Sequence, residues 1–349
     1  MILLELALIG FLVATASLVA LSRGPIAATA VFAAFSLGIA IVWVWLSAPD
    51  VALTEAAVGA GVMVLLLLVA AVRTNGGVDV QAPRGSSFRP INGPALLLAT
   101  AVAVPMAMTV VSLPDVGTPD APAVSETDPT GAGSPYAAYV GEPAVDLAIP
   151  NAVATVLTVF RSLDTLGEIV VAFTAVIGVL IVLGRTHLTA ERSPSPQSDR
   201  SDHPNPFAMS PVGMTAVRLV VPLVFVFGVS LTVQGLVEPG GGFQGGIVMG
   251  AALILVALLF GHRPTAEWID ERALVWLLVA GVWSVLGVVA GTALLAELNA
   301  DLLVRSIPPI YLAEFVEIGI DVAVGAIVTG LVFALALGLD GRFQGGDRR

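Results

Sequence analysis

Ionisable side chains are rare in this sequence, so those that lie within apolar stretches are the first candidates for chemistry. The stretch FRSLDTLGEIVVAF, residues 160–173, places Arg161, Asp164 and Glu168 at positions i, i+3 and i+7. On a continuous helix these three side chains would share one face. Ionisable groups at membrane depth are costly and usually face a bundle interior, a polar cavity or a proton path. The spacing therefore favours an ion-pathway site; the alternative is an interfacial Arg–Asp anchor, with the Glu168 carboxylate reaching water.

The stretch YLAEFVEIGIDVAVGAIV repeats this spacing with Glu314, Glu317 and Asp321, and no Arg is in register with them. Three ionised carboxylates on one face repel each other, so one must be protonated or a cation must lie beside them. We therefore expect a Na⁺ or H⁺ site near these three residues. The alternative is that Glu314 and Glu317 mark only the hydrated outer end of the helix.

A third polar group lies in LSAPDVALTEAAVGAGV. Asp50 follows Pro49 at an expected helix start, where an Asp side chain commonly acts as a helix cap. Glu55 follows within the apolar run and is the ion-pathway candidate of this group. Gly59 and Gly61 permit close helix contact or a local π-helical bulge.

The fourth group surrounds a glycine-rich turn, VQGLVEPGGGFQGGIVMG. Glu238 and Gln244 are its ion-pathway candidates. Consecutive glycines let a turn re-enter the membrane or let backbone groups line a site, whereas the alternative is a tight turn with close helix packing. No Lys follows and no strand is expected before it, which argues against nucleotide binding. The residues assigned to the structural turn are Pro239, Gly240, Gly241, Gly242, Gly245 and Gly246.

The elements that position these groups are predicted to be membrane-spanning helices. The 349 residues are 57% hydrophobic and 12% charged, whereas soluble domains carry about 25% charged residues. Apolar windows of roughly 20 residues predict an all-α integral membrane protein with about nine transmembrane helices and an outer interfacial helix near 151–167. The expected spans are 2–21, 25–46, 51–72, 94–113, 168–184, 218–236, 243–260, 273–295 and 311–338.

Two stretches rich in Pro, Ser, Gly and charge, residues 74–93 and 185–211, read as cytoplasmic linkers. They divide the helices into blocks of three, two and four: 1–73, 94–184 and 212–340, followed by a tail at 341–349. Arg residues concentrate in loops on one side, whereas the loop 114–150 is acidic and lacks Arg. The positive-inside rule then places this loop and the N-terminus outside and the C-terminus in the cytoplasm.

Composition also excludes several function classes. The chain has 15 basic and 26 acidic residues, with a net charge of −11, which argues against a nucleic-acid partner. It has no Cys, so disulfides, thiolate metal sites and iron–sulfur ligation are unavailable to it. Its three His residues stand at no ligand spacing. We expect no cofactor and no catalytic residue of an enzyme.

The motifs together resemble a specific family. WLSAPDVALTEAAVGAGVMVLLLLVAAVR is similar to the segment that ends the A-type subunit of Mrp-type multisubunit Na⁺/H⁺ antiporters, elsewhere a separate D-type (MbhD-like) subunit of membrane hydrogenases. FRSLDTLGEIVVAFTAVIGVL resembles the adjoining E-type (MbhE-like) segment, with its R-x-x-D-T-x-G-E pattern. VRLVVPLVFVFGVSLTVQGLVEPGGGFQGG resembles the start of the B-type (MnhB) subunit, except that Val237 and Glu238 replace the usual motif before Pro239. The order D-like, E-like, B-like matches the three blocks.

This resemblance implies a plasma-membrane subunit of an Mrp-type antiporter that exchanges Na⁺ for H⁺. The large pump domain of the A-type subunit is absent, so the resemblance implies partners of the A, C, D, E, F and G types, within the lipid bilayer, and no activity for the chain alone. One alternative is the ion-translocating arm of a membrane hydrogenase or related oxidoreductase. Another is a structural scaffold whose charges only pair subunits.

Overall fold

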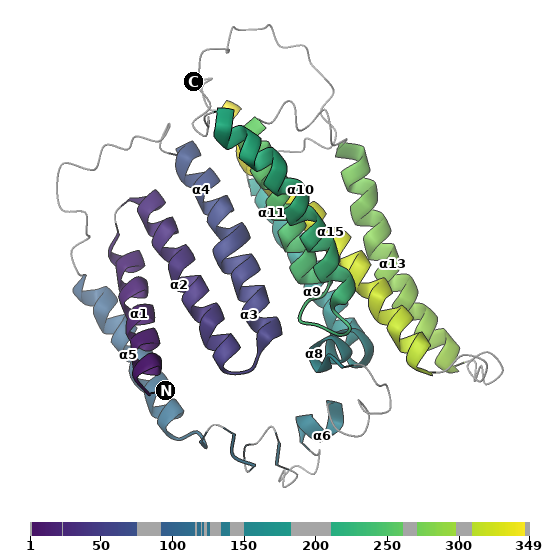
Figure 1. The fold of residues 1–349 in the computed structure, drawn as a ribbon, viewed down its shortest axis with the longest axis horizontal. Coiled ribbons are helices and arrows are strands. Elements are labelled where there is room, and N and C mark those ends of the chain that lie inside the picture. Colours follow the sequence, from purple (N-terminus) through teal and green to yellow (C-terminus); the bar gives the residue numbers. More distant parts are fainter. Residues whose placement is uncertain are drawn as a thin grey trace, which may run out of the picture.

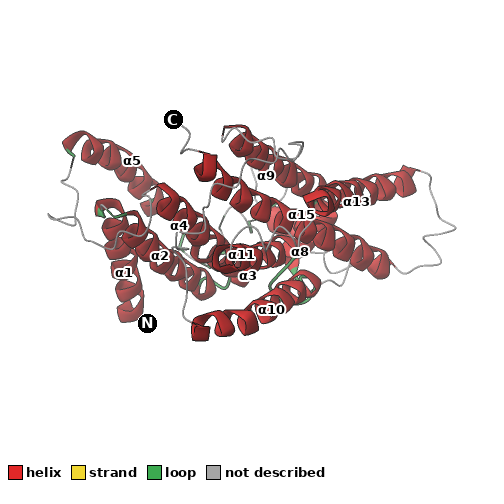
Figure 2. Cartoon of the chain, turned by 90° about the horizontal axis from the view of Figure 1, so that it is seen from above, coloured by secondary structure: helices red, strands yellow, loops and turns green. Residues whose placement is uncertain are grey.

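The computed structural model describes residues 2–22, 24–74, 92–115, 117–119, 121, 124–125, 134–139, 150–182, 211–260, 271–297 and 309–345. The elements in these ranges are helices joined by loops, with no strand among them (Figure 2). The prediction of an all-α protein is therefore confirmed.

The first block contains three helical rods that lie side by side (Figure 1). They are α1 (Ile2–Leu21), α2 (Pro25–Trp45) and a third rod that continues from α3 (Pro49–Glu55) through η1 (Ala56–Val62) into α4 (Met63–Thr74). Both α2 and α3 begin at a proline, a residue suited to the first helical turn because that turn leaves its N–H groups unpaired. The π-helix η1 contains Gly59 and Gly61, so a π-helical segment, one of the two alternatives that the sequence left open for these glycines, is present.

The second block contains α5 (Gly93–Val111), the short α6 (Pro135–Tyr139), α8 (Ala152–Ala154), the π-helix η2 (Thr155–Phe160) and α9 (Ser162–Val182). The short helix that was expected before the second span of this block is present as α8 and η2. It ends at Arg161, whose φ of −127° and ψ of 36° leave the helical region. The following helix begins at Ser162, six residues earlier than predicted, so the prediction of a span start at 168 was wrong. The predicted start was too late because the first turn of α9 is polar: Asp164 and Thr165 belong to the helix despite their polarity.

The third block contains α10 (Pro211–Gln234), α11 (Gly242–Phe260), α13 (Glu271–Glu297) and the long α15 (Pro309–Gly345). Helix α15 packs against α11 and α13, and α10 packs against α11 (Figure 1). The most deeply buried part of the protein lies along α15, where Ile320, Ile327 and Phe333 are almost fully inaccessible. This helix forms the centre of the bundle.

The three blocks pack against each other rather than standing apart. The π-helix η1 and α4 of the first block contact α11 and α15, and η2 and α9 of the second block also contact α15. The apolar core includes Val62 from the first block, Ile169 from the second and Ile320 from the third. The core is thus shared among the three blocks.

In the part of the chain that the structure describes, eight helices are long and apolar enough to cross a membrane. The remaining predicted span, 273–295, corresponds to α13, a helix of 27 residues whose apolar part covers Leu278–Gly291. Within the described residues, the expected spans thus all fall on helices, and the chain is a multi-pass membrane protein.

Glycines set the spacing between α10 and α11. A Cβ atom at Gly245 would lie 2.0 Å from Thr232 Oγ1 and 2.5 Å from the backbone oxygen of Gly228. A Cβ atom at Gly246 would lie 2.7 Å from the backbone oxygen of Gly325 on α15. The prediction that Gly242, Gly245 and Gly246 belong to the turn was wrong, because α11 begins at Gly242, directly after the turn. Their role is helix packing.

We predict that Gly245→Ala destabilises the protein, because the new methyl group meets a backbone carbonyl that cannot move aside; overpacking of this kind costs about 1–3 kcal/mol. The matched control is Gly287→Ala in α13, where a Cβ atom would meet nothing within 4 Å. That control should be neutral or stabilising, since Ala favours a helix over Gly by about 1 kcal/mol. The thermal midpoint of the detergent-solubilised protein should fall for the first variant only. Equal midpoints would contradict this account of the packing.

Candidate functional site

A cavity of about 80 Å³ lies between the second and third blocks. Such a volume has room for several water molecules. Its apolar lining comes from η2, α9 and α15, and the backbone of the glycine turn forms part of the wall. Its polar side chains are Thr158, Thr165, Glu168, Gln244 and Asp321. Two carboxylates from segments distant in the sequence therefore face one space.

Asp321 contributes the buried carboxylate of this cavity. It lies in α15 and is 9% exposed. The backbone N–H of Gly242, the first residue of α11, donates a hydrogen bond to it. A Cβ atom at Gly242 would lie 2.0 Å from the backbone oxygen of Asp321, and one at Gly235 would lie 2.7 Å from Asp321 Oδ2. Only glycine fits at these positions.

The glycine turn also requires an unusual backbone conformation. Gly241 has a φ of +128°, which residues with a side chain rarely adopt. Its N–H donates to the backbone oxygen of Leu231 at 2.9 Å, which closes the turn onto the end of α10. The prediction that glycines let backbone groups line a site is consistent with this wall.

Glu168 contributes the second carboxylate. It lies in α9 and is exposed in the isolated chain, although it also lines the cavity. The cavity thus combines one carboxylate that is accessible from outside with one that is buried. The carboxylates can accept protons, and carboxylate, hydroxyl and amide oxygens can all bind a hard cation.

Gln244 connects the cavity to the first block. Its Nε2 donates to Thr54 Oγ1 at 2.9 Å, and that hydroxyl donates to the backbone oxygen of Asp50 at 2.9 Å. Glu55, the next residue after Thr54, lies elsewhere: Ser36 on α2 donates to Glu55 Oε1 at 2.6 Å. Glu55 is not among the residues that line the cavity.

The contact between Ser36 and Glu55 depends on the π-helix. A Cβ atom at Gly59 would lie 2.0 Å from Ser36 Oγ and 2.7 Å from Glu55 Oε1. Ser36 is fully buried. Gly59 therefore leaves space for the hydrogen bond between Ser36 and Glu55.

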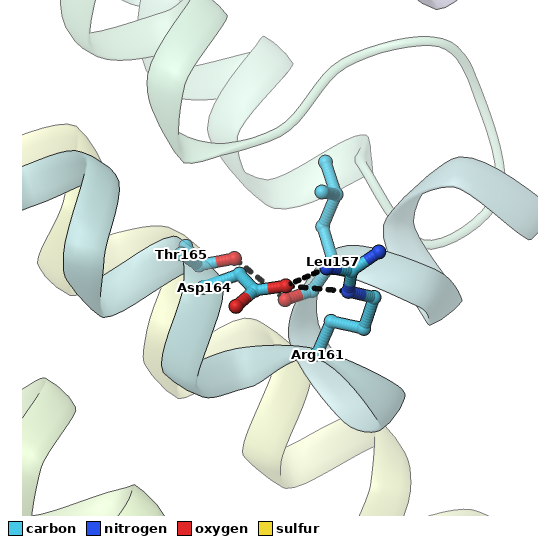
Figure 3. A network of polar contacts seen from close by, with 4 residues as sticks. All are labelled: Leu157, Arg161, Asp164 and Thr165. Carbon is cyan, nitrogen blue, oxygen red and sulfur yellow. Dashed lines mark hydrogen bonds and ion pairs between the residues drawn. The ribbon is translucent and has the colours of Figure 1, made fainter.

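Arg161 and Asp164 form an ion pair at the break between η2 and α9 (Figure 3). Their side chains are 53% and 52% exposed, and neither lines the cavity. Next to the pair, Thr165 Oγ1 donates to the backbone oxygen of Leu157 at 2.6 Å, which satisfies a carbonyl freed by the break (Figure 3). The three charges that the sequence placed on one face are thus divided between a surface pair and a cavity residue.

The remaining acidic candidates lie in different surroundings. Glu317 is fully buried on α15, one turn before Asp321. Glu238 is exposed. The side chain of Glu314 lies outside the described residues. Among the described residues, no three His, Cys, Asp or Glu side chains converge to hold a metal ion. The expected cation site near Glu314, Glu317 and Asp321 stays a prediction.

Asp50 does not act as the predicted helix cap. The N-cap of α3 is Ala48, which makes no side-chain capping bond. The Asp50 carboxylate is 8% exposed and reaches the other two blocks: its Oδ1 accepts from the N–H of Gly240 in the third block at 3.1 Å and from Asn151 Nδ2 in the second block at 3.2 Å. The local sequence, Pro followed by Asp, is the same for a cap and for this long-range contact, which explains the error.

Sequence reasoning missed Asn151. It is the N-cap of α8, and its Oδ1 accepts from the N–H groups of Val153 and Ala154. An Asn directly before an apolar run is a recognisable helix-start signal. Its contacts with the other two blocks have no signal in the sequence.

Comparisons with known proteins match two stretches of the chain. The family model MbhD, which describes the D-type subunit of MBH, matches residues 10–76. The family model MnhB, a domain related to the MnhB subunit of Na⁺/H⁺ antiporter, matches residues 212–336. These stretches coincide with the first and third blocks.

Similar curated proteins cover parts of the chain. An uncharacterized protein of Methanocaldococcus jannaschii is 34% identical over 134 residues, which are 36% of this chain and 50% of that protein. A probable A/B-type K⁺/H⁺ antiporter component of Rhizobium meliloti is 29% identical over 155 residues, 41% of this chain and 15% of that protein. The putative antiporter subunit mnhB2 of Staphylococcus aureus is 27% identical over 130 residues, 36% of this chain and 92% of that protein. The chain thus spans half or less of the length of the first two of these relatives.

A solved structure resembles almost the whole chain. A chain in the structure of the Mrp complex from Dietzia sp. DQ12-45-1b superposes with a TM-score of 0.64 at 22% identity, covering 98% of this chain and 35% of that chain. This likeness concerns the fold. Residues 10–76 and 212–336 thus carry an MbhD domain and an MnhB-related domain, joined in one chain with the fold of an Mrp-complex component.

Proposed function

We propose that this chain is a membrane subunit of a multisubunit monovalent cation/proton antiporter of the Mrp type. The observation that carries the proposal is the cavity that Glu168 and Asp321 share between two blocks. The MnhB-related domain and the resemblance to an Mrp-complex component support it.

The chemistry of the cavity suits a proton or a dehydrated Na⁺. A carboxylate in an apolar bundle exists either protonated or beside a cation, because an isolated charge there is costly. Glu168, which is exposed, exchanges ions with the outside of the chain, and Asp321 receives them in the interior. Thr158, Thr165 and Gln244 supply additional oxygen ligands or hydrogen bonds to water. The site does not require a redox cofactor.

The location, orientation and segments that we propose for the chain are those predicted from its sequence. The chain lies in the plasma membrane with its N-terminus outside and its C-terminus in the cytoplasm, and the D-like, E-like and B-like segments are 1–73, 94–184 and 212–340. A pump component of the A type and further subunits supply the remainder of the transport route. Glu55, Glu238, Glu314 and Glu317 extend the polar route beyond the cavity.

A second candidate is an ion-translocating arm of a membrane hydrogenase or related oxidoreductase. The match of residues 10–76 to the MbhD model favours it. The two candidates differ in what co-purifies, since electron transfer requires iron–sulfur or nickel subunits.

We predict that everted vesicles with this chain and its partner subunits show Na⁺-dependent collapse of a pH gradient, and that vesicles with the chain alone do not. The reason is that the proposal assigns the polar site to this chain and the pump component to a partner subunit. Fluorescence quenching of a pH-sensitive dye measures the exchange. Exchange by the isolated chain would contradict its assignment as one component of a complex, and an assembled complex without any cation-dependent exchange would contradict the antiporter assignment.

We predict that Glu168→Gln and Asp321→Asn each lower the exchange rate at least roughly tenfold at matched amounts of complex, because loss of a positioned proton-transfer group typically costs a factor of 10² or more. The control is the double variant Arg161→Gln with Asp164→Asn. It removes an exposed ion pair outside the cavity, and such pairs contribute at most about 1 kcal/mol. Its exchange rate should stay close to that of the unaltered complex. If the two cavity variants lower assembly and leave the rate of the assembled complex unchanged, the charges serve a scaffold instead.

A further inference from the structure

We propose that Asn151 is a positioning residue: with Asp50 it holds two walls of the cavity at the separation at which Glu168 and Asp321 face the same space. Asn151 does not line the cavity itself. The proposal rests on the proposed function for its transport readout and is independent of it for its structural readout.

Both polar atoms of the Asn151 side chain make hydrogen bonds. Its Nδ2 donates to the backbone oxygen of Gly235 at 2.8 Å, to that of Glu238 at 3.2 Å and to Asp50 Oδ1 at 3.2 Å. Its Oδ1 accepts from the N–H groups of Val153 at 3.0 Å and Ala154 at 3.2 Å. An amide has two donor hydrogens and two acceptor lone pairs, so the capacity of this side chain is fully used.

The backbone of Asn151 adds three more contacts. Its N–H donates to the backbone oxygen of Leu236 at 3.2 Å, and its carbonyl accepts from the N–H of Thr155 at 3.0 Å and from Thr155 Oγ1 at 2.8 Å. The residue is only 8% exposed. One residue of the second block is therefore fixed to the first block through Asp50 and to the third through the turn at 235–238.

These contacts end on both walls of the cavity. Val153 and Ala154, whose N–H groups bond to Asn151, line one wall. Gly240, whose N–H bonds to Asp50, lines the cavity from the third block together with Gly241 and Gly242, which form a second wall. Asn151 and Asp50 bond to each other, so the two walls are joined by a continuous set of hydrogen bonds.

Two roles of Asn151 are separable by substitution. As an N-cap, any side chain with a suitable oxygen serves, and Ser is as good as Asn. As the link between blocks, the side chain must also donate hydrogen bonds to carbonyls and to a carboxylate, which Ser in the same place is too short to do. Asn151→Ser therefore keeps the cap and removes the side-chain bonds of the link, and the backbone bond to Leu236 remains.

Asp50 provides the matched control. Asp50→Asn removes the charge and keeps an oxygen that accepts from Gly240 and Asn151. If the role of this pair is positional, Asp50→Asn retains it. If the role depends on the negative charge of Asp50, Asp50→Asn abolishes that role.

The first test measures the cavity wall directly in the assembled complex. The chain has no cysteine, so Thr158→Cys introduces a single thiol at a cavity position that is 3% exposed. Reaction with a small methanethiosulfonate reagent reports how often the wall opens. We expect Asn151→Ser to speed labelling roughly fivefold to thirtyfold, because several buried hydrogen bonds are lost together. With Asp50→Asn the rate should stay within about twofold, since the accepting oxygen remains.

The second test measures exchange at matched amounts of complex. We expect Asn151→Ser to raise the Na⁺ concentration needed for half-maximal exchange, and Asp50→Asn to leave it near that of the unaltered complex. Asn151→Asp is a second variant that keeps the capping oxygen and loses the donor group of the side chain. It should behave like Asn151→Ser in both tests.

The outcomes separate the two proposals. Labelling and exchange of Asn151→Ser equal to those of the unaltered complex would reduce Asn151 to a helix cap and overturn the inference. Equal defects in Asp50→Asn and Asn151→Ser would show that charge rather than position matters, which also overturns it. If the unaltered complex shows no exchange, the proposed function fails, and the labelling test alone decides the role of Asn151.

Discussion

The contact between the glycine turn and Asp321 is the constraint on which the rest of the site depends. Gly242 lies against the backbone of Asp321 so closely that a Cβ atom would be 2.0 Å from its oxygen. This approach puts the first N–H group of α11 within reach of a carboxylate that has little access to water. In an apolar bundle such a carboxylate needs a donor or a cation, because the loss of hydration is not otherwise compensated. The glycines are thus a chemical requirement as much as a packing requirement.

The same turn is fixed from its other side by the first two blocks. Gly240 donates to Asp50, and the carbonyls of Gly235 and Glu238 accept from Asn151. The turn consequently has one face that bonds to the carboxylate of the cavity and another that bonds to the neighbouring blocks. A shift in the packing of the blocks would move the wall of the cavity with it. This links the assembly of the chain to the geometry of its polar site.

Local features were predictable from the sequence, and contacts between blocks were not. Hydropathy located the helices, because a membrane span needs a long apolar run, and the glycines at 59 and 61 indicated the π-helix. The sequence drew attention to the polar residues of FRSLDTLGE, and their role as a site stays a prediction; their division between the surface pair and the cavity depends on the break at Arg161. The bond of Asn151 to Asp50 joins residues 101 positions apart, and that of Gln244 to Thr54 joins residues 190 apart. A hydrogen bond of this kind leaves no periodic pattern, so only the folded chain reveals it.

The placement of the cavity has a consequence for the two matched domains. The MnhB-related stretch, residues 212–336, contributes Gln244, Asp321 and the glycine turn, whereas Glu168 and Asn151 lie outside both matched stretches. Asp50, which bonds to the turn, comes from the MbhD stretch. A chain limited to residues 212–336 would carry the buried carboxylate and one wall, and it would lack the second carboxylate and the groups that hold the turn. The polar site is therefore a property of the joined blocks, and any arrangement that supplies them as separate polypeptides must rebuild the same hydrogen bonds across an interface between subunits.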